Sequence, residues 1–432
     1  MAAMRITRRT FVVGAGAGAL AVLLASCRGA DPAPSPSPTA SATPSPTPSP
    51  TESPAVPEPS AFVRSRWSTD PFALGARSAV LAGGVSGARA TLAEPIDDRL
   101  FFAGEAYDED APGTVAGALQ SGYDAAQAVS GAGSVGERFA VIGAGAAGAA
   151  AGQRLAAWGF DVTVIEARDR PGGRIASEPG DEWGVTPQLG PWILGAGDAS
   201  LSAQLPAYDV EVVGLAGDDL LGSLRESAAQ AADGATLAET VDQALPAFAA
   251  LTGADPQTVS AQSLPAWPVA PYEAVTGDLT ALAGQLLDGV DVTYSTSVTA
   301  IFADDRGVSL RFASGESLSF DRVVVTLPVG VLQKGSVEFD PPLSDDRQSA
   351  LDALDAGAIE YAWLRYDEPI WDDGATFRQS PEGPIRLWVD LREATGEPIL
   401  VGVAGADDAR EFAAMSDDDA RAAALASLAA VA

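Results

Sequence analysis

The sequence predicts an α/β fold, and three observations lead to this prediction. A short apolar strand, a glycine-rich turn, a helix of small residues and a second apolar strand follow one another in residues 139–167. Residues 292–332 alternate between apolar and polar positions, with turn signals at 305–307 and 314–315, as strands joined by hairpins do. A chain of 432 residues is long enough for such a Rossmann-like domain with an inserted α+β domain.

Charge and missing residue types exclude several kinds of function. The 58 Asp and Glu residues exceed the 26 Lys and Arg residues and give a net charge of −32, so nucleic acid is not an expected partner. The chain has no histidine and one cysteine. This excludes catalytic triads built on imidazole, zinc sites that use histidine, and a disulfide within the chain. We therefore predict no metal site.

The first 27 residues have the features of an export signal. Arg8 and Arg9 precede an apolar run, from Phe11 to Ser26, that is too short to span a bilayer comfortably. Residues 7–11 resemble a twin-arginine signal, whose pathway exports folded proteins that often carry a cofactor. We therefore expect export by this pathway.

Cys27 marks a possible lipid anchor. Residues 24–27 resemble a bacterial lipobox, in which the cysteine is acylated; the alternative is an ordinary cleavage site with an incidental cysteine. The single cysteine of the chain occupies the position that the motif requires. Residues 28–60 are rich in proline and serine and are expected to form a disordered linker. We expect a protein anchored at Cys27 on the outer face of the bacterial cytoplasmic membrane.

The glycine-rich turn predicts a dinucleotide site. Gly143, Gly145 and Gly148 follow the spacing G-x-G-x-x-G. The first glycine permits a tight turn, the second lets a pyrophosphate approach the backbone, and the third lets the helix pack closely on the strand. Glu166 ends the second strand, where it can accept hydrogen bonds from a ribose. The following sequence Arg-Pro-Gly-Gly-Arg, residues 170–174, makes a chance match improbable.

Residues 141–177 resemble the FAD-binding opening of the flavin-containing amine oxidase superfamily, which includes monoamine and polyamine oxidases and lysine-specific histone demethylase. The resemblance implies FAD as cofactor, in a domain of the glutathione-reductase and amine-oxidase type. Residues 188–195 resemble the loop that passes under the flavin, and Val298 lies where the family meets the adenine through its backbone. The residues that this part of the resemblance assigns to FAD are Gly143, Gly145, Gly148, Glu166, Arg168, Gly172, Gly173, Arg174, Gly190, Pro191, Trp192 and Val298.

Two stretches that precede the glycine-rich turn resemble the C-terminal end of the family's sequences rather than their beginning. Residues 66–78 and 99–129 resemble the closing segment of the family, while residues 398–432 match the helix that normally leads into it. We therefore expect a circularly permuted chain. A truncated tandem array, the alternative, would carry a second copy of the stretch around Trp67 or of the Ala-Gly-Glu motif at 103–105, and neither appears. The resemblance places Glu105 near the ribityl or pyrophosphate part of FAD, and Thr114 and Val115 near the flavin pyrimidine.

The sequence departs from the family where the substrate is oxidised. Many members place a lysine near flavin N5, but here the position holds Tyr361, or Glu360 after a slip of one residue. Lys334, the one lysine of the chain, lies in a segment that the family uses for structure.

The aromatic cage of the family is also changed. Arg77 replaces the expected tyrosine, and Thr114 faces it. Arg77 either binds a carboxylate or points outward. The residues predicted to line the space in front of the flavin are Arg77, Thr114, Trp192, Tyr361 and Trp363.

These observations divide the chain and suggest its function. We expect an exported FAD-dependent oxidase that acts on a C–N bond of an amine or amino acid, with oxygen as acceptor. A desaturase or other oxidase of the same fold, and an FAD-binding lipoprotein that has lost catalysis, remain alternatives. The predicted segments after the linker are 61–130 (permuted closing segment), 131–136 (join), 137–200 (FAD-binding), 201–272 (helical part of the substrate domain), 273–340 (middle FAD segment) and 341–432 (substrate sheet and helix).

Overall fold

The computed structural model of the protein describes residues 56–134, 136–217, 221, 245–372 and 374–431. The predicted signal, Cys27 and most of the linker lie outside the described residues. The stretch 219–244, which contains most of the amphipathic sequence expected in the substrate domain, also lies outside them except for Leu221.

A parallel sheet forms the centre of the nucleotide-binding part, in the order β3–β13–β4–β5–β9. Strand β4 is buried at four of its five positions, since both faces of a parallel sheet are covered. Strand β3 precedes β4 in the chain and is separated from it in the sheet by β13. The strands are β3 (Leu100–Phe102), β4 (Arg138–Ile142), β5 (Asp161–Ile165), β9 (Asp291–Thr293) and β13 (Arg322–Val325).

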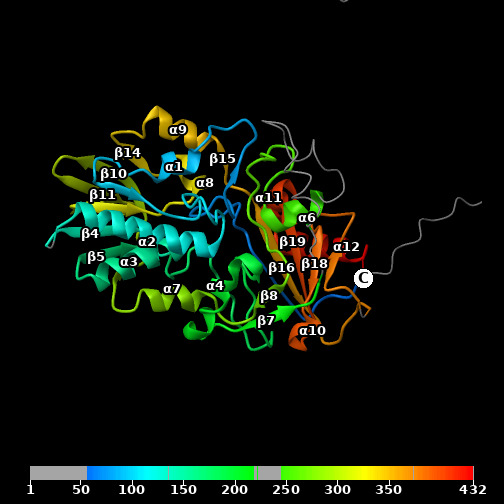
Figure 1. The fold of residues 1–432 in the computed structure, drawn as a ribbon. Helices are drawn as coiled ribbons and strands as arrows, with labels where there is room; N and C mark the ends of the chain where they lie inside the picture. Colours follow the sequence, from blue (N-terminus) through cyan, green and yellow to red (C-terminus); the bar gives the residue numbers. More distant parts are fainter. Residues whose placement is uncertain (1–55, 135, 218–220, 222–244, 373, 432) are drawn as a thin grey trace, which may run out of the picture. The chain divides into compact units, whose positions relative to one another are not determined.

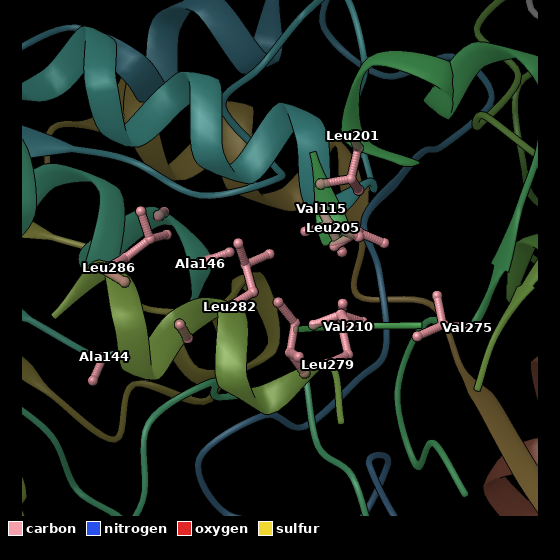
Figure 2. Close-up of a cluster of buried hydrophobic side chains, with 14 of the residues drawn as sticks. Val115, Ala144, Ala146, Leu201, Leu205, Val210, Val275, Leu279, Leu282 and Leu286 are labelled. Carbon is pink, nitrogen blue, oxygen red and sulfur yellow. The ribbon is translucent and has the colours of Figure 1, made fainter. Parts of the chain in front are cut away.

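Helices α2 (Val115–Ala132) and α3 (Ala146–Ala157) pack side by side, as Figure 1 shows. Their contact is close because the facing residues are small: a Cβ at Gly122 would lie 2.2 Å from the carbonyl oxygen of Ala147. Helix α7 (Thr280–Leu286) packs against α3. Its leucines belong to the apolar cluster drawn in Figure 2, together with residues near the starts of α2 and α3.

The predicted hairpins of the middle segment are confirmed. Strands β10, β11 and β12 follow one another as antiparallel neighbours, and β14 pairs parallel to β10 at the edge. The turns fall at the predicted positions, between β10 and β11 and between β11 and β12. The strands are β10 (Val298–Asp304), β11 (Gly307–Phe312), β12 (Ser317–Phe320) and β14 (Glu338–Asp340).

A second five-stranded sheet is antiparallel and has the order β1–β16–β19–β18–β17. Its first strand comes from the segment that we expected to serve FAD binding, so residues 61–130 contribute to both parts of the protein. Helices α6 and α11 contact this sheet. The elements are β1 (Ala61–Arg64), β16 (Ile359–Arg365), β17 (Phe377–Gln379), β18 (Leu387–Asp390), β19 (Ile399–Gly405), α6 (Leu245–Thr252), α11 (Ala406–Ala414) and α12 (Asp417–Leu428).

The prediction of a helical segment over residues 201–272 is wrong in part. Strand β7 (Val212–Leu215) lies within it and pairs with β8 (Tyr272–Val275), which also pairs with β6 (Ile193–Leu194). The β-branched residues Val212 and Val213 favour a strand, and this signal was overlooked in the sequence. The helical elements described in or beside this segment are α4 (Ala199–Ser202), η2 (Leu205–Tyr208) and α6 (Leu245–Thr252).

One apolar core joins the two large sheets. Val141 and Val164 of the parallel sheet and Trp363 and Val401 of the antiparallel sheet belong to the same buried cluster. Across the described ranges, no helix is long and apolar enough to cross a membrane. The remaining elements are α1 (Ala88–Ala93), α8 (Val329–Lys334), α9 (Asp345–Asp352), α10 (Arg392–Thr395), η1 (Ala196–Asp198), β2 (Ala79–Val80) and β15 (Leu354–Asp355).

Candidate active site

The turn between β4 and α3 forms one wall of a cavity of ≈ 410 Å³. Gly143 has φ of 103°, and a Cβ on Gly148 would lie 1.9 Å from the carbonyl oxygen of Gly143, so the helix can approach the turn only without side chains there. Gly145 caps α3 and faces the cavity, with no atom closer than 3.8 Å to where its Cβ would be. The free N–H groups at the start of α3 therefore face open space beside the turn.

The Gly-Gly-Arg stretch forms a second wall against this turn. Gly172 donates its N–H to the carbonyl of Ala144 at 2.9 Å, and Gly172 and Gly173 have φ of 98° and 59°. These conformations suit glycine, and they bring the backbone next to Gly145. Two glycine-rich backbones thus meet at the same place in the cavity.

Glu166 is buried at the end of β5 and is held by backbone groups. Its carboxylate accepts hydrogen bonds from the N–H of Ala144 at 2.7 Å and from the N–H of Arg168 at 2.8 Å. Arg168 in turn pairs with Asp70 at 2.6 Å, and its guanidinium lies 5.4 Å from the ring centroid of Phe72. The acid predicted to bind a ribose is therefore fixed in orientation at the edge of the cavity.

Glu105 is the centre of a buried polar cluster. It pairs with Arg174 at 3.1 Å and accepts a hydrogen bond from the Ser78 hydroxyl at 2.7 Å, while Arg89 donates to the same hydroxyl at 2.7 Å. Burial alone would raise the pKa of Glu105. Arg174, Arg89 and the hydrogen bonds from Ser78 outweigh burial, so the pKa lies below its ordinary value. The ionised carboxylate fixes Arg174 at the cavity wall.

The start of α2 contributes the predicted pyrimidine-side residues. Thr114 caps the helix by accepting a hydrogen bond from the N–H of Gly117 at 3.0 Å, and Val115 follows it. Both residues line the cavity, as do Gly190, Pro191 and Val298. The cavity therefore brings together segments that lie far apart in the chain.

Arg77 and Tyr361 lie at the same cavity, and neither is a surface residue. The outward alternative for Arg77 is wrong: its Nε and Nη2 atoms are inaccessible to solvent. Burial lowers the pKa of Arg77, with Glu105 and Tyr361 acting in the opposite direction. Burial raises the pKa of Tyr361 to about 12, although the Arg77 charge opposes this shift. Tyr361 is consequently a neutral hydroxyl at ordinary pH.

Two predicted lining residues are instead part of the core. Trp192 and Trp363 are almost fully buried and stand 5.3 Å apart, ring centroid to ring centroid, outside the set of residues that line the cavity. Trp363 donates its indole N–H to the carbonyl of Gln188 at 2.8 Å. Trp192 also packs edge to face against Tyr361, with the ring centroids 6.4 Å apart, so the core supports the Tyr361 ring.

Glu360 does not take the place of the missing lysine. It lies outside the cavity lining, and its carboxylate accepts hydrogen bonds from Ser65, from the N–H of Trp67 at 3.0 Å and from the N–H of Ser68 at 2.8 Å. This carboxylate anchors the segment that carries Trp67 to the cavity. Lys334 is exposed at the end of α8 and lies away from the cavity lining.

The structure adds residues that the sequence reasoning did not select. Asp70 and Phe72 contact Arg168 and lie within residues 66–78, which resemble the closing segment of the family, so that segment contained the signal. Ser78 ends the same stretch. Arg89 belongs to no motif, and only the fold brings it to Glu105.

The residues at this cavity fit FAD. A helix N-terminus and Arg174 suit a pyrophosphate, and Glu166 keeps lone pairs for the hydroxyls of a ribose. Apart from Gly148, which packs beneath the turn, and Trp192, every residue predicted to bind the cofactor lines this one cavity.

A family model described as flavin containing amine oxidoreductase matches residues 48–130 and 214–432. The chain belongs to this family. A second model, for an NAD(P)-binding Rossmann-like domain, matches residues 141–203, between the two parts of the first match. Both matches agree with the α/β fold predicted from the sequence, and FAD is the cofactor of this flavin amine oxidase-type chain.

Curated relatives of this flavin amine oxidase include a lysine-specific histone demethylase 1 homolog 2 of Oryza sativa subsp. japonica. It is 26% identical over 329 residues, which cover 63% of this chain and 43% of the relative. Polyamine oxidase 4 of the same organism is 25% identical over 341 residues, which cover 65% of this chain and 70% of the relative. The chain thus spans less than half the length of the demethylases that it matches.

Solved structures of two oxidases share the fold. Wild-type putrescine oxidase with bound putrescine has a TM-score of 0.54 at 20% identity, with 68% of this chain and 81% of that chain covered. Cyclohexylamine oxidase from Brevibacterium oxydans IH-35A has a TM-score of 0.54 at 22% identity and the same coverage. At these identities the likeness establishes the fold of the flavin amine oxidase chain.

Proposed function

We propose that the protein oxidises a C–N bond of a small amine or amino acid, with oxygen as electron acceptor. The observation that carries this proposal is the continuity of one cavity from the glycine cradle at Gly145 to Arg77 and Tyr361. A cofactor held by the cradle and a substrate at Arg77 and Tyr361 would share the same space. The names of the relatives, polyamine oxidase and putrescine oxidase among them, support an amine as substrate.

FAD, when bound, supplies the hydride acceptor and the route of electrons to oxygen. The chain supplies position and charge. The start of α3 and Arg174 offset the charge of a pyrophosphate, and Glu166 accepts hydrogen bonds from ribose hydroxyls. In the overall reaction, amine, water and oxygen give a carbonyl compound, ammonia or a smaller amine, and hydrogen peroxide.

Among the residues that the structure describes, the substrate end offers no base at neutral pH. Of the described residues that line the cavity there, Tyr361 is a neutral phenol and Arg77 is a cation. A substrate amine must therefore arrive with its lone pair free. The rate is expected to rise with pH until the substrate amine itself is deprotonated.

Visible spectroscopy tests the proposal directly. The chain from Ala61 onward, which begins at β1, is purified, its visible spectrum is recorded, and pooled amines and amino acids are added without oxygen. Bleaching of a bound flavin by one pool, with recovery in air, is the expected result.

Other outcomes favour the alternatives. A bound flavin that no pool bleaches favours a desaturase-type reaction or a protein without catalysis. Either alternative agrees with Tyr361 in place of the lysine that many members of the family carry. A chain that binds no FAD after reconstitution contradicts the proposal.

We also propose that the protein is exported through the twin-arginine pathway and anchored by a lipid on Cys27. The motifs around residues 7–11 and 24–27 support this location. Replacing Cys27 by alanine should release the protein from the membrane fraction. Unchanged membrane association of the variant would contradict the lipid anchor.

Finally, we propose that the chain is circularly permuted relative to the family. Val56 and Val431 pack against the same apolar cluster, and Glu58 pairs with Arg421 at 3.5 Å, so the two ends of the folded part lie close together. The predicted join lies between the end of α2 at Ala132 and the start of β4. Neighbouring ends and a short join are what a permutation requires.

A further inference from the structure

Arg77 is a half-buried cation that the described part of the chain leaves largely without partners. Its Nη1 donates to the carbonyl of Leu251 at 3.4 Å, which is a long hydrogen bond. Its Nε and Nη2 are inaccessible to solvent and have no hydrogen-bond partner among the described residues. Gly113 makes room for the side chain, since a Cβ there would lie 2.8 Å from Nε.

The nearby carboxylates are occupied by other groups. Glu105 is held by Arg174 and Ser78, and Asp198 accepts a hydrogen bond from the N–H of Gly195 at 3.0 Å. No ion pair joins Arg77 to an acid within the described ranges. Charged donors that neither water nor a protein group reaches are costly to the folded state, so their presence in a side chain that lines a cavity indicates that a ligand supplies the partner.

The guanidinium has two unused donors on adjacent nitrogens, Nε and Nη2. Both lie beside Gly113 in this conformation, so a ligand in the cavity that Arg77 lines reaches them only after the side chain turns. A planar pair of N–H groups matches the two oxygens of a carboxylate. The same cavity wall carries the neutral Tyr361 hydroxyl and the apolar Ile359 side chain, neither of which would compete for an anion. A second cation on the substrate would instead be repelled by Arg77.

We propose that Arg77 binds an anionic group of the substrate, a carboxylate in the first place. The substrate is then an amino acid or another amine that carries an acid group, and not a diamine or polyamine. This inference rests on the proposed function, because it takes the Arg77 end of the cavity as the substrate end. It makes Arg77 the residue that decides between substrate classes.

The test measures binding without turnover. The FAD-loaded protein is titrated with benzoate, benzamide, phenylphosphonate and benzylamine while the visible spectrum of the oxidised flavin is followed. We expect benzoate to bind, and Arg77→Gln to weaken its binding at least ~10-fold, as loss of charged hydrogen bonds implies. Arg77→Lys should bind benzoate with intermediate affinity, because a single ammonium cannot form the paired contact.

Two controls isolate the role of the charge. Benzamide has the shape of benzoate without its charge, and its affinity should not change in Arg77→Gln. Arg311→Gln removes an exposed arginine that pairs with Glu338 at 3.0 Å on the β10–β14 sheet, and it should bind benzoate as the original protein does. Tighter binding of phenylphosphonate than of benzoate would assign the site to phosphonate-like anions and overturn the carboxylate.

Three results would overturn the proposal altogether. They are equal benzoate affinity in Arg77→Gln and the original protein, tighter binding of benzylamine than of benzoate, and loss of FAD from an Arg77→Gln variant that still folds. Thermal unfolding of the original protein and of Arg77→Gln, each with and without benzoate, gives a second comparison whose readout does not depend on flavin. A chain that fails to bind FAD contradicts the proposed function, while a benzoate-induced rise in Tm that requires Arg77 still supports the anion site.

Discussion

At the scale of single residues, Glu105 holds the cationic wall of the site in place. Its carboxylate joins Arg174 to Ser78, and Ser78 receives Arg89. Removing the charge from Glu105 leaves two buried guanidinium groups with less compensation. We predict that Glu105→Gln lowers the free energy of unfolding at pH 7 by about 3 kcal/mol, measured by urea denaturation.

The stability that Glu105 contributes should depend on pH in a defined direction. The pKa of Glu105 is lower in the folded protein than the ordinary value of 4.5. Its stabilising contribution is therefore complete above pH 4.5 and is lost as the pH falls through the lowered pKa. The difference between Glu105→Gln and the original protein should shrink below pH 4.5. An equal change on Glu338→Gln, whose carboxylate pairs with Arg311 on the surface, would contradict the special role of burial.

Tyr361 occupies the position at which many relatives were expected to carry lysine. Its hydroxyl, with a pKa raised to about 12, can donate a hydrogen bond at any ordinary pH. We predict that Tyr361→Phe lowers kcat/KM about 2- to 10-fold, as the loss of one neutral hydrogen bond implies. The pH profile between about pH 6 and pH 10 should keep its shape, because Tyr361 does not ionise there. A profile that loses its alkaline limb would show that Tyr361 titrates during turnover.

Residues fixed by local chemistry could be predicted from the sequence, and those fixed by packing could not. The turn at Gly143 and the acid at Glu166 follow from spacing along one strand–turn–helix–strand unit. Arg77 lies in a loop, and the direction of its side chain depends on the space that Gly113 leaves free. This space is set by packing and could not be predicted from the local sequence. Strand alternation placed Tyr361 and Trp363 on one face, but it could not tell that only Tyr361 reaches the cavity.

At the scale of elements, the contact between α2 and α3 depends on a missing side chain. A Cβ at Gly122 would lie 2.2 Å from the carbonyl oxygen of Ala147, in the backbone of α3. We predict that Gly122→Ala lowers the free energy of unfolding by about 1–3 kcal/mol, because the two helices must move apart. Thermal unfolding measures the change, and weaker FAD binding should accompany it, since α3 carries the cradle.

Gly131 on the same helix is the matched control. A Cβ there would meet nothing within 4 Å, and alanine favours a helix over glycine by about 1 kcal/mol. Gly131→Ala should therefore leave stability unchanged or raise it. A loss of stability as large as that of Gly122→Ala would mean that the close contact between α2 and α3 does not explain the effect of Gly122→Ala.

The antiparallel sheet illustrates which element contacts a sequence hides. Strand β1 pairs with β16, which follows it about 300 residues later in the chain, with Ala61 opposite Arg365. Glu360 on β16 then fixes the backbone of Trp67 and Ser68 through hydrogen bonds. Neither segment contains a local signal for this contact. The sequence around Trp67 therefore could be recognised as a motif, but its hydrogen bonds to Glu360 could not be predicted.

At the scale of the whole molecule, chain order and fold are separable. In the parallel sheet, β3 precedes the glycine-rich turn in the chain and β13 follows it much later. The two strands are nevertheless direct neighbours, with Phe101 of β3 opposite Val324 of β13. What the sheet requires is the pairing of these strands. The order in which the chain visits them affects folding mainly through the loops that connect them.

The proposed permutation can therefore be reversed. A chain that begins at residue 137, runs to 431, continues through a short Gly-Ser linker to 56 and ends at 132 keeps the described helices and strands intact. We predict that it folds, binds FAD and unfolds within a few degrees of the original protein, because Val56 and Val431 already pack against one cluster. Co-purified flavin and a thermal melt measure the outcome.

The position of the cut decides what this result means. A second rearranged chain, opened within β10 at residues 300 and 301 instead of between α2 and β4, breaks a strand paired on both sides. It should aggregate or lose FAD, while the chain opened between α2 and β4 should not. If both chains fail, the connection from α2 to β4 is itself required for the fold, and the proposed permutation loses its physical support.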